Sequence, residues 1–124
     1  MENNSKIVKF EDLNVWQKSQ DLAVEIYQIF KDSKEFDLRS QIIRATLSIS
    51  NNIAEGFDQH SKKEFIRFLN IALASNSELK SMLYFLKRVK LLNELEAIKL
   101  QENLIEISKL LNRLIKSVAK SAKN

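Results

Sequence analysis

Apolar residues recur at spacings of three and four in four stretches of the chain, a pattern typical of helices with one buried face. The stretches cover approximately residues 12–32, 38–56, 62–89 and 94–120. Proline is absent and glycine occurs once, so little interrupts long helices. Short polar segments join the stretches, which predicts an all-α fold: one up-down-up-down antiparallel four-helix-bundle domain over residues 1–124.

Residues that can cap a helix stand at the start of each stretch: Asp12, Asp37, Ser61 and Asn93. A glutamate follows Ser61 and Asn93 at the third position, which predicts a capping box at the start of the last two helices. Gly56 closes the second stretch, and we expect it to end that helix as a left-handed residue.

The second stretch carries a line of polar residues between two apolar flanks. Its members are Gln41, Arg44, Ser48, Asn52 and Glu55. Polar groups beside packed apolar surface need hydrogen-bond partners, so this polar seam is predicted to be structural or to form an interface. Glu78 of the third helix is a candidate acceptor for Arg44 or Gln41, with an ordinary exposed glutamate as the alternative.

Small residues suggest which helices approach most closely. Ala45, Ser48 and Asn52 lie together on the second helix. The third helix has its own small residues at its middle: Ala72, Ala74 and Ser75. Because small side chains on both sides permit the shortest interaxial distance, we expect these two surfaces to face each other.

Charge is distributed unevenly along the chain. Residues 1–60 hold 7 Lys/Arg against 10 Asp/Glu, and residues 61–124 hold 13 against 6. Five cations follow one face at the end of the fourth helix, over about 21 Å at 1.5 Å per residue: Lys109, Arg113, Lys116, Lys120 and Lys123. Antiparallel packing brings the start of the third helix beside them, with Lys62, Lys63 and Arg67. These eight residues are the candidate nucleic-acid-binding set; a solvated face that answers the helix dipole is the alternative.

Several site classes lack the residues that they need. The chain has no cysteine, which excludes disulfides and thiol chemistry, and His60 is its one histidine. A di-iron bundle requires two Glu-x-x-His pairs, and none occurs. We therefore expect no enzymatic activity, no metal and no cofactor. Without a signal peptide or an apolar run of about 20 residues, the protein is expected in the cytoplasm, with no membrane partner.

A set of motifs links the chain to a known family. The second helix contains Ser48-Ile49 and Asn52-Ile53-Ala54-Glu55-Gly56, preceded by Gln41 and Arg44-Ala45. Further matches are Phe10, Asp12-Leu13, Val15-Trp16-Gln17, Phe65, Phe68-Leu69, Ile71-Ala72, Ser75 and Glu78-Leu79. In this order and spacing they resemble the bacterial four-helix-bundle family of 23S rRNA intervening-sequence proteins. Ile43 departs from the pattern, because the family often has a second arginine there.

The resemblance implies a role near RNA. Relatives are encoded within intervening sequences of large-subunit rRNA genes, and a related branch assists the reverse transcriptase of diversity-generating retroelements as a pentameric ring. Our hypothesis is a homo-oligomer, with five copies implied by the resemblance, that binds RNA through its basic end. A nucleic-acid-processing protein is another candidate partner. The alternative is a protein–protein adaptor without nucleic-acid binding. Trp16 lies on an apolar stripe, which favours a core position over base stacking.

Overall fold

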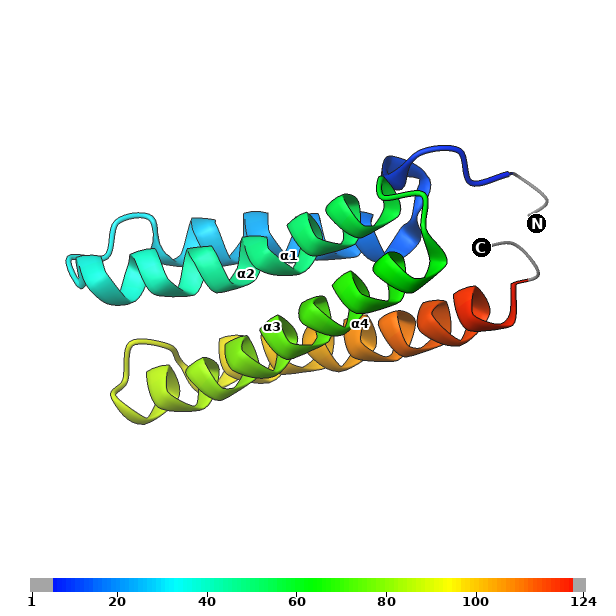
Figure 1. The fold of residues 1–124 in the computed structure, drawn as a ribbon. Coiled ribbons are helices and arrows are strands. Elements are labelled where there is room, and N and C mark those ends of the chain that lie inside the picture. Colours follow the sequence, from blue (N-terminus) through cyan, green and yellow to red (C-terminus); the bar gives the residue numbers. More distant parts are fainter. Residues whose placement is uncertain (1–5, 122–124) are drawn as a thin grey trace.

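The computed structural model describes residues 6–121 and confirms the four-helix bundle. A 3₁₀ turn, η1 (Phe10–Asp12), precedes the helices α1 (Asn14–Phe30), α2 (Phe36–Phe57), α3 (Lys62–Arg88) and α4 (Glu94–Lys120). Consecutive helices run antiparallel, and α1 with α2 forms one layer over α3 with α4 (Figure 1). The loop between α2 and α3 lies at the same end as η1 and the last turn of α4.

One hydrophobic core runs the length of the bundle, and every helix contributes to it. The large side chains that are fully enclosed are Leu22, Ile26, Ile42, Ile49, Ile53, Leu69, Leu79, Leu83, Leu86, Leu100, Leu104 and Ile107. Each enclosed side chain of this size stabilises the fold by about 1.5–3 kcal/mol relative to exposure. The core accounts for the three-and-four spacing that the sequence displays.

The two predicted capping boxes have different outcomes. At the start of α4 the box is confirmed: the Glu96 N–H donates to Asn93 Oδ1 over 2.8 Å, and the Asn93 N–H donates to Glu96 Oε1 over 3.4 Å. At the start of α3, Ser61 Oγ accepts from the Glu64 N–H over 3.3 Å. The carboxylate of Glu64 binds Arg67 instead of returning to the cap, so this box is half formed.

The predicted caps at Asp12 and Asp37 are wrong. Asp12 accepts the N–H groups of Val8 and Lys9, each over 3.2 Å, and so caps η1 instead of α1. Asp37 lies inside the first turn of α2, whose N-cap position is Glu35. There its charge favours the positive end of the helix dipole without a capping hydrogen bond.

Gly56 does not end α2 as a left-handed residue; it lies inside the last turn and is buried. A Cβ at this position would lie 2.5 Å from Phe68 Cβ and 3.2 Å from Phe65 Cδ1, both on α3. Gly56 is therefore required for the close approach of two helices. The residue with positive φ after α2 is His60, at 55°.

Candidate nucleic-acid interface

The cations of α4 form an exposed row along the outside of the bundle. Lys109, Arg113, Lys116 and Lys120 are all exposed. Within residues 6–121, none of the four has a carboxylate within salt-bridge distance. The row covers about 17 Å of a continuous helix. Lys123, the fifth predicted member, lies outside the described residues.

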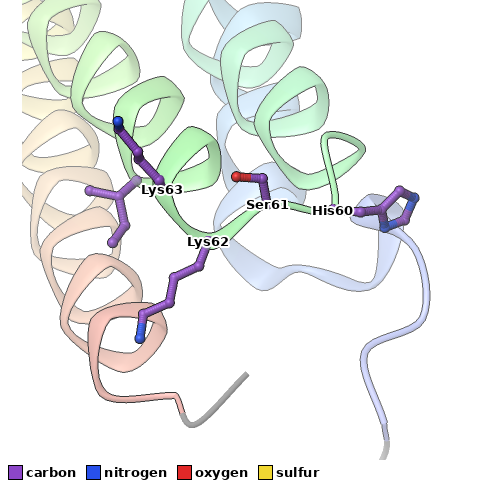
Figure 2. A pocket seen from close by; sticks show the side chains of 5 residues that line it. His60, Ser61, Lys62 and Lys63 are labelled. Atoms are coloured by element: carbon purple, nitrogen blue, oxygen red, sulfur yellow. The ribbon is translucent and has the colours of Figure 1, made fainter. Parts of the chain in front are cut away.

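The start of α3 joins this row at the end of α4. Lys62 Nζ donates to the carbonyl oxygen of Ser121 over 2.8 Å, which confirms the predicted meeting of the two helix ends. Lys62 points toward the last turn of α4, and Lys63 points to another side of α3 (Figure 2). An open hollow of about 550 Å³ lies here, lined by His60, Ser61, Lys62, Lys63 and Ile66. The five residues Lys62, Lys109, Arg113, Lys116 and Lys120 are called the basic surface below.

Arg67 lies apart from the basic surface. Its Nε and Nη2 both lie 2.9 Å from Glu64 Oε1. The guanidinium also stands 4.5 Å from the centre of the Phe68 ring. Because Phe68 packs against Gly56, this group belongs to the α2 side of α3, away from α4. Its charge is already partnered by a carboxylate and an aromatic face.

The aromatic side chains divide between the two ends of the bundle. At the end that carries the basic surface, Phe10 and Trp16 form an edge-to-face pair at 5.2 Å, and Phe57 and Phe65 another at 5.7 Å. All four pack against the core, which confirms the core position of Trp16. The exposed aromatics of residues 6–121 stand near the opposite end of their helices: Tyr27, Phe36, Tyr84 and Phe85.

The polar seam of α2 forms part of the contact with α3. Ser48 Oγ and Ser75 Oγ share a hydrogen bond of 2.7 Å, so the predicted facing of small residues is confirmed. Asn52 Nδ2 donates to the carbonyl oxygen of Ser48 over 2.7 Å and to its hydroxyl over 3.0 Å. Ser48 and Asn52 are half-buried, and their hydrogen bonds hold the centre of this contact.

The outer members of the seam face solvent in the single chain. Gln41, Arg44, Glu55 and Glu78 are exposed. Arg44 Nη2 donates to Ser40 Oγ over 3.1 Å. Among the described residues no hydrogen bond joins Glu78 to Arg44 or Gln41.

Two polar contacts were not identified from the sequence. Asn76 is 4% exposed and its Nδ2 donates to the carbonyl oxygen of Leu104 over 3.0 Å, which ties α3 to α4. In the sequence, the feature that indicates this contact is the position of Asn76 in a row of buried leucines, where a polar side chain needs a partner. Gln20 Nε2 donates to Ser50 Oγ over 2.9 Å and marks the sides of α1 and α2 that meet. Ser50 stands between the matching pairs Ser48-Ile49 and Asn52-Ile53 of the family motif, and its contact with Gln20 is seen only in the folded chain.

Uncharged residues surround the Gln20–Ser50 contact on both helices. Positions three, four and seven residues away share a helix face, and all of them are uncharged; they include Trp16, Ala23, Val24, Tyr27, Ile43, Leu47 and Ala54. Val24 is 59% exposed, Tyr27 50% and Leu47 39%. In a chain with 29% charged residues, this uncharged α1–α2 face is unlike the basic surface in both composition and exposure.

Other site classes are not found in the part of the chain that the structure describes. Residues 6–121 contain no group of three His, Cys, Asp or Glu side chains placed to hold a metal ion. Over the same range, no helix is both long and apolar enough to cross a membrane.

Known proteins similar to this chain share its fold and define its family. The family model of the 23S rRNA-intervening sequence proteins matches residues 11–113. A crystal structure of a protein of unknown function from the S23 ribosomal protein family of Bacteroides thetaiotaomicron is similar, with a TM-score of 0.78 and 35% sequence identity. That similarity covers 82% of this chain and 95% of the other. No curated protein matches the chain. The chain belongs to the family of 23S rRNA-intervening sequence proteins.

Proposed function

We propose that the protein is a non-enzymatic, homo-oligomeric scaffold of the cytoplasm that binds RNA through the basic surface. The observation that carries this proposal is the row of exposed cations on α4 that lacks carboxylate partners within residues 6–121. A row of this kind neutralises phosphates and releases their counterions, which is the main source of nonspecific affinity for nucleic acid. The family is named for 23S rRNA, so RNA is the first polyanion to test.

Interaction with the helix dipole is the simplest other explanation of the row, and it covers one residue. The dipole effect falls off within the last turn of a helix. Lys120 lies in the last turn of α4, but Lys109 and Arg113 lie two to three turns before its end. The dipole therefore leaves most of the row unexplained.

The uncharged α1–α2 face supports the homo-oligomer. Interface cores are poor in charged residues and rich in aromatic ones, and the uncharged α1–α2 face exposes Val24, Tyr27 and Leu47. Each copy carries a net charge of +4, so an uncharged face lets copies meet with the least repulsion. Five copies remain the number that the family resemblance implies.

Charge reversal tests the RNA-binding part of the proposal. The double variant Lys116→Glu/Lys120→Glu should bind all RNA sequences more weakly in a mobility-shift titration. The plot of log affinity against log salt should flatten by about one unit for each lost phosphate contact. A variant with the same charge change at the opposite end, Lys31→Glu/Lys34→Glu, should retain a larger part of the affinity. Equal affinity of the double variant and the wild type would favour the protein–protein adaptor.

Light scattering tests the oligomer. The wild type should have a mass several times the 14.4 kDa of one chain at micromolar concentration. Val24→Glu/Tyr27→Glu should reduce that mass, because it places charge in the proposed contact. Ile105→Glu adds a carboxylate to an exposed apolar position of α4 and serves as the control. A wild-type mass of one chain would contradict this part of the proposal.

A further inference from the structure

We infer that the basic surface accepts double-stranded RNA in preference to single-stranded RNA. This inference rests on the proposed RNA binding and adds the class of RNA. It follows from the positions of the aromatic side chains relative to the cations, and from the rigidity of the helix that carries the cations.

Single-stranded nucleic acid is usually held by aromatic platforms on which successive bases stack. At the end of the bundle with the basic surface, the described phenylalanine and tryptophan rings are occupied. Phe10 packs on Trp16 and Phe57 on Phe65, and Arg67 covers Phe68. The exposed ring at this end is the imidazole of His60, which lies on the loop before α3. A single strand that lies along the cations of α4 therefore finds no free ring among them.

The exposed aromatic side chains are far from the cations. Tyr84 and Phe85 lie in the last two turns of α3, and Tyr27 and Phe36 lie near the loop between α1 and α2. The basic surface is concentrated toward the other end of helices such as α4, which has 27 residues and a length of about 40 Å. Bases of a strand bound at Lys116 or Lys120 cannot reach these rings while its phosphates stay on the cations.

The cations themselves suit a ligand whose phosphates are already ordered. Lys109 to Lys120 lie on one uninterrupted helix, so their backbone positions are fixed. A duplex presents phosphates in a rigid array, whereas a single strand must lose conformational freedom to match the same row. A duplex also carries the denser counterion atmosphere; for B-form DNA the salt slope is about 0.9 per phosphate contact, against about 0.7 for single strands. Recognition of duplex RNA through shape and phosphate contacts needs no reading of bases.

Competition between two RNAs tests the inference. A 20-base-pair RNA hairpin and a 40-nucleotide oligouridine carry nearly equal numbers of phosphates, and the oligouridine does not fold. The hairpin should bind the full-length protein at least tenfold more tightly at the same salt concentration. Equal or tighter binding of oligouridine would overturn the inference and leave the proposed function standing. If neither RNA binds at low salt, the proposed function itself is overturned, and the inference with it.

A gain-of-binding variant examines the reason for the preference. Asn112 is exposed, and it lies three residues after Lys109 and four before Lys116, on the same side of α4. Asn112→Tyr places a ring among the cations and should raise the affinity for oligouridine about fivefold, with little change for the hairpin. Asn112→Gln is the control without a ring. If Asn112→Tyr does not bind oligouridine more tightly than the wild type, the lack of stacking rings is not the cause of the preference for duplex RNA.

Discussion

The contact between α2 and α3 and the contact between α1 and α4 hold one bundle together by different means. Between α2 and α3, the backbones approach at Gly56, and Ser48 bonds Ser75. Between α1 and α4, ion pairs at the solvent edge bridge the helices: Lys18 to Glu106 over 3.3 Å and Lys99 to Glu25 over 3.2 Å. The first contact depends on the size of its side chains, and the second on charges that solvent screens. The comparison predicts unequal tolerance to substitution.

The largest effect is expected at Gly56. In Gly56→Val the new side chain meets Phe68 Cβ, so either the helices separate or neighbouring side chains leave their rotamers. We expect a loss of about 2–3 kcal/mol in the free energy of unfolding, measured by chemical denaturation. Gly56→Ala should lose less, because alanine regains about 1 kcal/mol of helix propensity. An unchanged denaturation midpoint for the valine variant would show that the contact adjusts easily.

A smaller effect is expected at Ser75. Ser75→Ala removes one partner of the Ser48 hydroxyl, which keeps its hydrogen bond from Asn52. The expected loss is about 1 kcal/mol, because the remaining hydroxyl is still partly satisfied. Ser77→Ala, at an exposed position of the same helix, is the matched control and should change the unfolding free energy little. If the two variants have equal melting curves, the Ser48–Ser75 hydrogen bond does not contribute measurably to stability.

The smallest effect is expected at the ion pairs. Lys18→Met and Lys99→Met each remove one pair between α1 and α4 while keeping most of the aliphatic stem. Because the side chains of both pairs are partly exposed, each variant should lose about 0.5 kcal/mol or less. The loss should shrink further in 1 M salt, where screening acts over about 3 Å. A loss as large as that of Gly56→Val would remove the distinction between the two contacts.

The sequence predicts the bundle well because the apolar spacing depends only on which residues face the core. The helix ends agree within two residues, and the topology correctly brings Lys62 to the end of α4. The predicted functions of single residues were less reliable. A glycine that closes an apolar run has the same sequence signature whether it ends a helix or permits a close approach, and only the position of Phe68 separates the two at Gly56.

In the candidate site, too, the sequence predicts positions along a helix better than it predicts the contacts of single side chains. The row on α4 could be predicted because its members lie on one helix, and their spacing is fixed by the helix itself. Arg67 could not be separated from it, since its Glu64 and Phe68 contacts depend on side-chain conformation. The positive φ angles at His60 and Lys90 could not be predicted either, because neither residue is a glycine. The uncharged α1–α2 face depends on which sides of α1 and α2 meet, and the Gln20–Ser50 hydrogen bond that marks these sides joins residues 30 positions apart.

The end of the bundle where Lys62 bonds Ser121 matters for experimental work on this protein. Both η1 and the last turn of α4 lie there, so the described chain enters and leaves the bundle beside the basic surface. A tag or fluorophore attached close to either of them would crowd the cations and disturb a binding titration. The turns after α1 and α3, at residues 31–35 and 89–93, point away at the opposite end and suit a cysteine for labelling. Because the chain has no native cysteine, such a label would be unique.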